Sequence, residues 1–194
     1  MFHGRPLRTL IATVALSVVS LAAQAGVTLH YEGTAKDRAS ADQVLATARV
    51  EAQRRGWKIE SANLPNAVVT RIIDEVEKPY TGTLTGIVIY PHPMCEPLYL
   101  QFGSDLFLQD FVKTQFAGPD IHVGVVELLR KIQPYFRELK VDDEGEYWPA
   151  RDRTKLAHNL DAVNVMIDNI KRSHPGAKGP IKLPDGRIID VAAP

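Results

Sequence analysis

The sequence predicts a single-domain α+β protein, in which a mainly antiparallel sheet of about five to seven strands packs against three helices. Two observations lead to this fold class. Several segments with alternating or β-branched apolar residues follow one another through short turns, and strands joined in this way usually pair antiparallel. Three other segments carry apolar residues at helical spacing, and each such stripe needs a sheet face to cover.

The first 25 residues have the three parts of a cleavable signal peptide. Arg5 and Arg8 precede an apolar run of about 12 residues, and Ala23 and Ala25 form a small-x-small cleavage site. The run is too short for a permanent membrane span, which needs about 20 residues. We therefore expect cleavage after Ala25, a globular α+β domain over 26–174, and a Pro/Gly-rich tail over 175–194 with a possible hairpin.

The first two elements of the predicted domain are a strand and a helix. Apolar and polar residues alternate over 27–32, which is the pattern of a half-buried strand. Ser40 and Gln43 then form a capping box for a helix over about 41–55, and Gly56 provides its left-handed end.

Consecutive strands follow this helix. A short strand at 57–59 and a β-branched run over 67–76 are separated by the turn residues 63–66, which indicates a hairpin. The Pro/Gly segment 78–82 is expected to break the pattern. Three further strands are predicted at 84–90, 98–102 and 106–114, although a short helix is the alternative for the last.

The second half of the chain contains two helices. Gly118 and Pro119 precede a helix that Asp120 is expected to cap and that ends before Pro134. A brief strand at 139–141 leads to a second helix, whose apolar residues recur regularly from Leu156 until the stop at 173–175. The turn residues 184–186 predict a small hairpin in the tail.

Composition argues against several classes of partner. Without residues 1–25 the chain has 21 basic and 23 acidic residues, a formal charge of −2. This balance gives no bulk attraction to nucleic acid or anionic lipid, so we expect neither nucleic-acid binding nor stable membrane insertion after cleavage. Because Cys95 is the single cysteine, an intramolecular disulfide is impossible.

The loop over 91–97 contains His92, Cys95 and Glu96, which are ligand types for zinc or copper. A structural site usually needs four such ligands, and the other histidines lie on distant segments. We therefore expect no metal and no cofactor. Two alternatives stay open for this loop: a metal-handling protein built on His92 and Cys95, and a Cys95 nucleophile activated by a histidine.

An acidic and aromatic segment over 142–148 follows the strand predicted at 139–141. Tyrosine and tryptophan beside carboxylates are typical of polar binding surfaces. Carboxylates in a cleft can also serve as the acid and base of glycoside cleavage. The residues of this segment predicted to bind a partner are Asp143, Glu144, Glu146, Tyr147 and Trp148.

Lys113 and His122 flank the start of the helix predicted after Pro119, where free N–H groups can hold an anion. We add both residues to the predicted binding set. The serine-hydrolase elbow, the zinc-protease helix and the nucleotide-binding glycine patterns are absent from the sequence.

The sequence therefore favours a periplasmic or secreted domain that binds a protein or cell-wall partner without catalysis. Such a partner would be a toxin, an envelope enzyme or a cell-wall component. The competing hypothesis is an envelope hydrolase in which the acidic cluster acts with His122. The metal-handling protein is the third hypothesis.

Overall fold

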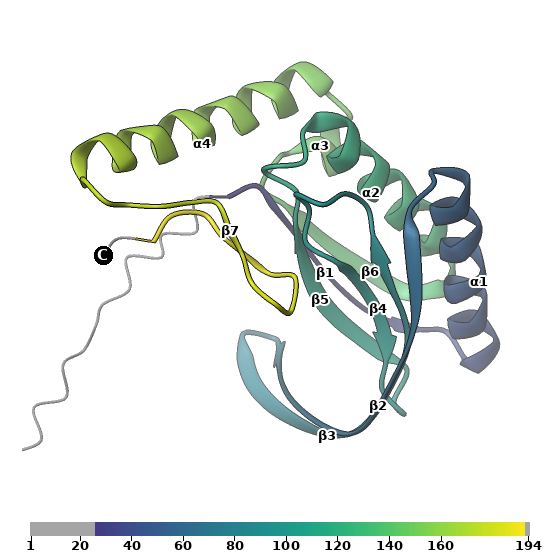
Figure 1. Cartoon of the computed structure of the whole chain (residues 1–194). Coiled ribbons are helices and arrows are strands. Elements are labelled where there is room, and N and C mark those ends of the chain that lie inside the picture. Colours follow the sequence, from purple (N-terminus) through teal and green to yellow (C-terminus); the bar gives the residue numbers. More distant parts are fainter. Residues whose placement is uncertain (1–25, 193–194) are drawn as a thin grey trace, which may run out of the picture.

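The computed structural model describes residues 26–192, which form four helices and eight strands (Figure 1). The strands make three antiparallel sheets, with the orders β5-β1-β6, β2-β3-β4 and β7-β8, which confirms the predicted α+β class. In chain order the elements are β1 (Thr28–Ala35), α1 (Arg38–Arg54), β2 (Lys58–Ile73), β3 (Val76–Tyr90), β4 (Leu98–Phe102), β5 (Phe107–Lys113), α2 (Pro119–Ile132), a 3-10 turn (Gln133–Tyr135), β6 (Phe136–Asp143), α3 (Tyr147–Ala150), α4 (Arg153–Ser173), β7 (Ile181–Lys182) and β8 (Ile188–Ile189).

The strand β1 separates the core from an open face, because successive side chains point to opposite sides of a strand. Leu29 and Tyr31 are buried in the core that the sheets share with α1 and α2. The alternate residues His30, Glu32 and Thr34 are only partly buried. The outer face of the sheet β5-β1-β6 is therefore polar and is available for other contacts.

The two three-stranded sheets meet where β4 turns into β5. No backbone ladder joins β4 and β5. The hydroxyl of Tyr31 instead bonds to backbone groups of β4. This hydroxyl donates to the carbonyl oxygen of Tyr99 at 3.0 Å and accepts from the N–H of Tyr99 at 3.1 Å. Burial raises the pKa of Tyr31 well above its usual value, so the hydroxyl keeps the proton that it donates.

A long hairpin of β2 and β3 extends beyond the sheet and curls back under it (Figure 1). The turn predicted at 63–66 is wrong, because β2 continues through these residues. The ladder to β3 shifts register between Leu64 and Ala67, and Asn66 has a φ of 57°. Asparagine tolerates this left-handed conformation, so the segment that resembles a turn is a bulge.

The true hairpin turn lies at Asp74 and Glu75, whose φ angles are 52° and 62°. The break predicted at 78–82 is also wrong, since β3 is continuous from Val76 to Tyr90. Pro79 lies opposite Thr70 in the ladder. A proline fits a strand where its missing N–H is not needed for the ladder, so it does not interrupt this one.

Arg71 fixes the curl of the hairpin. Its side chain is 8% exposed and pairs with Asp105 in the turn between β4 and β5. The guanidinium also lies 3.7 Å from the ring centre of Tyr80, whose hydroxyl accepts from the N–H of Ser104 at 3.0 Å. An arginine buried in this way must keep its partners, so the hairpin is anchored close to its tip.

Three predicted boundaries need correction. The helix α1 begins at Arg38 with Asp37 as its cap, because the Asp37 carboxylate accepts from the N–H of Ser40. The cap of α2 is Gly118, not Asp120, and Pro119 occupies the first turn. The strand β6 covers 136–143 instead of 139–141, because β1 provides a ladder partner along its whole length.

The hairpin of β7 and β8 is held to the body mainly by charged groups. The buried carboxylate of Glu96 accepts from the N–H of Ile188 at 2.7 Å and from the N–H of Lys113 at 3.1 Å. Arg187 pairs with Glu96 at 3.3 Å and with Asp110 at 2.6 Å. Groups of the β7-β8 hairpin therefore compensate a carboxylate that lies about ninety positions earlier in the sequence.

Among the helices of residues 26–192, none combines the length and the apolar character that a bilayer crossing requires. The signal peptide predicted over residues 1–25 lies outside the described part of the chain.

Candidate functional site

Two of the residues predicted to bind a partner meet inside the protein, together with a residue adjacent to a third predicted one. His122 on α2 contacts the Thr114 hydroxyl through Nδ1 at 2.8 Å and the Asp143 carboxylate through Nε2 at 3.2 Å. Thr114 and His122 are fully buried, and so is the Asp143 side chain. We call these three residues the buried cluster.

Every polar atom at the acidic end of the buried cluster has a partner. Besides His122, the carboxylate of Asp143 accepts from the N–H of Gly145 at 2.8 Å and from the N–H of Trp148 at 2.7 Å. Burial alone would raise the pKa of Asp143, but these hydrogen bonds and His122 lower it below its usual value. The buried cluster therefore joins α2, β6, α3 and the residue that follows β5, and its carboxylate is fully used within the protein.

The other predicted residues of the acidic segment make contacts within the protein, although Glu146 is exposed and, with Glu144, lines a separate hollow of about 380 Å³. Glu144 accepts from the N–H of Thr28 at 2.8 Å, and Glu146 pairs with Lys155 at 2.6 Å. Tyr147 is buried, and the guanidinium of Arg130 lies 4.6 Å from the ring centre of Trp148. Much of the binding capacity predicted for this segment is thus used within the molecule.

Lys113 is not placed to bind an anion at the start of α2. Its ammonium pairs with Asp190 at 2.8 Å and also donates to the carbonyl oxygen of Ile188 at 3.2 Å. Its side chain is only 15% exposed. Lys113 therefore attaches the terminal hairpin, whereas His122 belongs to the buried cluster.

The loop over 91–97 separates its candidate ligands. Cys95 is 1% exposed, and burial, with the charge of Glu96, raises the pKa of its thiol to about 12. Both oxygens of Glu96 accept from groups of the terminal hairpin, while His92 is exposed and accepts from the N–H of Met94 at 3.1 Å. Within residues 26–192, no three histidine, cysteine or acidic side chains gather as a metal site would require.

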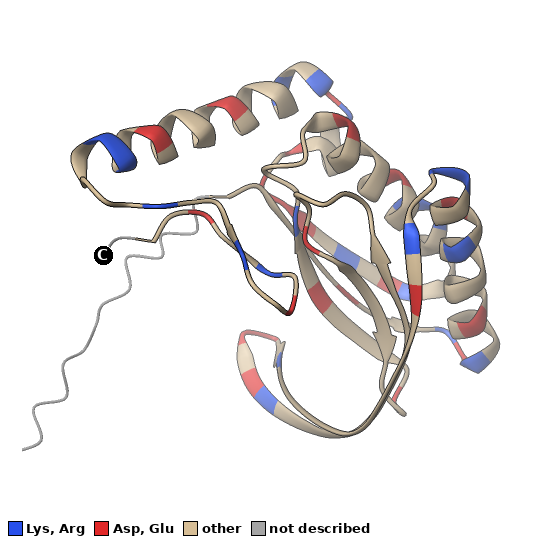
Figure 2. Ribbon diagram, in the orientation of Figure 1, with Lys and Arg blue, Asp and Glu red and all other residues tan. Residues whose placement is uncertain are grey.

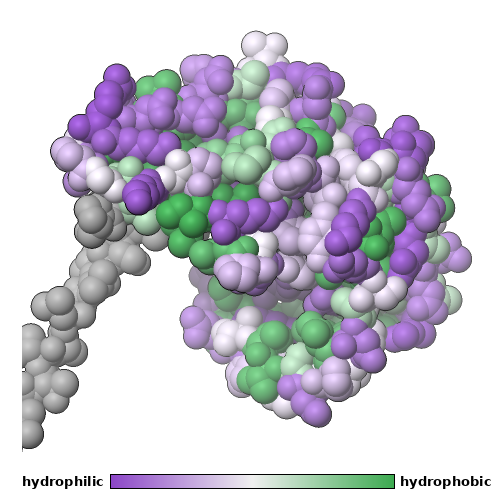
Figure 3. All heavy atoms as spheres, in the orientation of Figure 1, coloured by the Kyte–Doolittle hydropathy of each residue, from purple (hydrophilic) through white to green (hydrophobic). Residues whose placement is uncertain are grey.

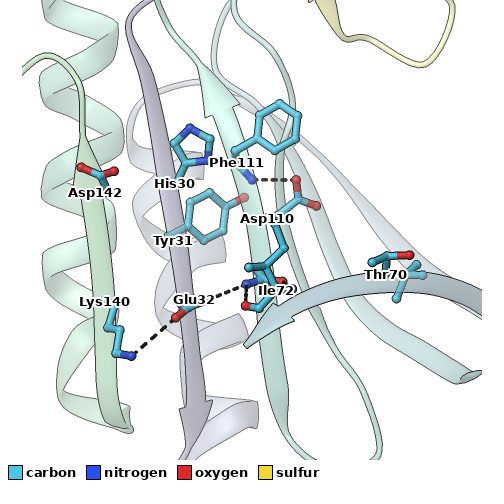
Figure 4. A pocket seen from close by; sticks show the side chains of 11 residues that line it. His30, Tyr31, Glu32, Thr70, Ile72, Asp110, Phe111, Lys140 and Asp142 are labelled. Carbon is cyan, nitrogen blue, oxygen red and sulfur yellow. Dashed lines mark hydrogen bonds and ion pairs between the residues drawn. The ribbon is translucent and has the colours of Figure 1, made fainter. Parts of the chain in front are cut away.

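A hollow of about 540 Å³ lies between β2 and the outer face of the sheet β5-β1-β6 (Figure 4). We call it the hairpin groove. A second hollow of about 330 Å³ shares Val69, Thr70, Gln109 and Asp110 with it and extends the same recess toward Arg187. The residues that line the hairpin groove are His30, Tyr31, Glu32, Val69, Thr70, Ile72, Gln109, Asp110, Phe111, Lys140 and Asp142.

The floor of the hairpin groove is built by the ladder of β5, β1 and β6. His30 pairs in register with Phe111 on one side and with Asp142 on the other, so the three side chains form a row across the face (Figure 4). The rings of His30 and Phe111 are 5.6 Å apart, and Glu32 pairs with Lys140 at 3.7 Å. This floor therefore offers an aromatic surface beside charged groups.

The wall of the hairpin groove is the free edge of β2. The side-chain amide of Gln109 accepts from the N–H of Ile72 at 2.8 Å and donates to the carbonyl oxygen of Ile72 at 2.6 Å. These are the two bonds that a neighbouring strand would make. Gln109 also donates to Glu32, so one side chain connects the wall to the floor.

Apolar side chains are exposed on the hairpin beside the hairpin groove. Val68, Ile72 and Val76 are 75%, 57% and 55% exposed, and apolar surface gathers on the curled hairpin in Figure 3. Acidic and basic residues are interspersed along α1 and α4, and charged residues also occur near the tip of the hairpin (Figure 2). Exposed apolar groups beside an open recess are typical of interaction surfaces.

Sequence reasoning missed the hairpin groove. The alternation over 27–32 gave a signal for its floor, since it places His30 and Glu32 on the side opposite Leu29 and Tyr31. Asp142 belongs to the acidic segment already singled out, but it faces the hairpin groove whereas its neighbour Asp143 faces the core. No local pattern indicates that the hairpin curls back over this face.

Comparisons of the chain with known protein families, with curated proteins and with solved structures found no match.

Proposed function

We propose that the protein is a non-catalytic binding protein that holds a macromolecular partner in the hairpin groove. The observation that carries this proposal is the open recess of about 540 Å³, bounded by a free strand edge and by a floor with an aromatic ring and charged groups. Recesses that combine apolar surface with a few polar groups are common ligand sites. The partner is a protein or cell-wall component, as the composition of the chain favours.

The geometry supports the hydrolase hypothesis less well. A general acid or base must reach its substrate within hydrogen-bond distance. His122 and Asp143 have fully buried side chains, and each is occupied by the other and by neighbouring groups. The metal-handling hypothesis is supported less for a similar reason, because the Cys95 thiol is buried and protonated.

The proposal includes a location outside the cytoplasm. The signal-like segment over residues 1–25 supports cleavage after Ala25 and release into the periplasm or the medium. Sequencing the N-terminus of the protein recovered from its native cells tests this part of the proposal. A chain that begins at Met1 would contradict it.

Affinity capture from the native envelope extract tests the binding proposal. We expect the wild-type protein to retain a stoichiometric partner, and His30→Trp to lose it at least tenfold by filling the hairpin groove. Val50→Trp is the matched control, because it adds the same ring at a position on α1 that is 61% exposed. Equal capture by His30→Trp and Val50→Trp would overturn the proposed site. Loss of the partner through Glu146→Ala with Trp148→Ala instead would return the site to the acidic segment.

A further inference from the structure

The edge of β2 in the hairpin groove has ladder positions without a strand partner. Within residues 26–192, β2 pairs with β3 alone. The backbone of Ile72 points away from β3, because its N–H and its carbonyl both bond to Gln109. In an antiparallel ladder every second residue points the same way, so the backbone groups of Thr70 and Val68 also face outward.

The position of Pro79 supports this assignment independently. Pro79 lies opposite Thr70 and has no N–H with which to form a hydrogen-bonded pair there. A proline is tolerated in a strand at such positions. The N–H of Thr70 is therefore directed outward, where a further strand would pair with it.

From this geometry we infer that the partner binds as an added β-strand, in which an extended segment of another polypeptide pairs with Thr70 and Val68. Gln109 marks the end of this pairing, since its amide already occupies the next position at Ile72. Strand addition to an exposed edge is a common mode of peptide recognition, in which main-chain bonds give affinity and side-chain pockets give selectivity. This inference rests on the proposed function and specifies the partner.

The side chains that line the hairpin groove indicate which side chains the added strand should carry. Glu32, Asp110 and Asp142 are acidic, whereas Lys140 is the one lysine or arginine in the lining. Within residues 26–192 Asp142 makes no ion pair, while Glu32 and Asp110 are already paired. Phe111 is 37% exposed beside His30. The segment therefore carries an apolar residue that packs on Phe111 and a lysine or arginine that reaches Asp142.

Proline substitution separates strand addition from other modes of binding. Thr70→Pro removes the outward N–H on the groove edge and spares the ladder to β3. Thr81→Pro is the matched control, because Thr81 lies opposite Val68 on β3 and faces the other edge of the hairpin. A displayed library of random linear peptides is selected on the wild-type protein, and the enriched peptides are synthesised for binding measurements.

We expect the enriched peptides to carry basic and apolar residues. They should bind wild type and Thr81→Pro alike, lose at least tenfold in affinity for Thr70→Pro, and slow the hydrogen exchange of the Val68 and Thr70 amides. Asp142→Asn should weaken the basic peptides alone. A selection that yields no peptide sensitive to Thr70→Pro would overturn strand addition. A wild-type dimer that Thr70→Pro dissociates would overturn it too, because the edge would then serve a second copy.

The two proposals fail in different ways. If Thr70→Pro retains the partner that His30→Trp loses in the capture experiment, the hairpin groove is the binding site and strand addition is wrong. If both variants retain the partner, the partner binds elsewhere and the hairpin groove is not the binding site.

Discussion

The buried cluster and the hairpin groove contain the same kinds of side chain but differ in what those side chains are free to do. In the buried cluster, a histidine and a carboxylate are enclosed and fully hydrogen-bonded. In the groove, His30 and Asp142 lie side by side on an open face. In this protein, residue type and proximity do not distinguish a candidate site from a structural cluster, whereas solvent access to the side chains does.

The largest expected effect separates two neighbouring aspartates. Asp143→Ala should lower the free energy of unfolding by about 3 kcal/mol or more, because it leaves His122 and two buried N–H groups without their acceptor. Asp142→Ala should change it by less than about 0.5 kcal/mol, since this side chain lines an open hollow. Urea denaturation measures both values. Equal losses in the two variants would break the comparison.

The pH dependence of stability sharpens the assignment of Asp143. Its pKa is lowered in the folded protein, so its stabilising contribution is complete above the unfolded pKa of about 3.9. This contribution is lost as the pH falls through the lower folded pKa. Urea titrations between about pH 6 and pH 2 should therefore show a smaller acid loss for Asp143→Ala than for wild type. Parallel curves would mean that another group causes the acid loss.

A smaller effect is expected at the other end of the buried cluster. Thr114→Val preserves the shape of the side chain but removes the hydroxyl that contacts His122, which should cost about 2 kcal/mol. Thr70→Val is the matched control on the exposed edge of β2 and should stay within about 0.5 kcal/mol of wild type. Thermal denaturation resolves this difference. A neutral Thr114→Val would show that water or another group satisfies the imidazole.

The smallest expected change concerns the lone thiol. Cys95 should react slowly with iodoacetamide at neutral pH in the native protein, because burial raises its pKa to about 12. Labelling followed by mass spectrometry should become fast only after unfolding in urea. Native labelling at the rate of an unfolded chain would reopen the nucleophile and metal hypotheses for the loop over 91–97.

The sequence predicted the elements whose signals are local. The apolar spacing around Leu156 and Leu160 identifies α4, and the Gly118 and Pro119 pair marks the start of α2. The hairpin was harder to predict for a physical reason. Asn63 to Asn66 have the composition of a turn but form a bulge, whereas Asp74 and Glu75 turn without the glycine that such φ angles favour.

The candidate site could not be assembled from local patterns. The hairpin groove forms only where residues of β1, β2, β5 and β6 come together. Arg71 and Gln109 hold β2 in place there through contacts with residues more than thirty positions away in the sequence. The sequence does point to two members of the buried cluster, because His122 and Asp143 are both among the predicted binding residues. Their burial depends on the packing of α2 and α3 against the sheet, which a single segment does not encode.

The attachment of the terminal hairpin through Glu96 has a consequence for the order of assembly. During synthesis Glu96 emerges about ninety residues before Arg187 and Ile188, the groups that later compensate its charge. Until those residues arrive, enclosing this carboxylate is costly, so the region around β4 and β5 stays incompletely closed. The hairpin of β7 and β8 therefore acts as a latch, and we expect the region around Glu96 to close fully only in chains that have been synthesised through this hairpin.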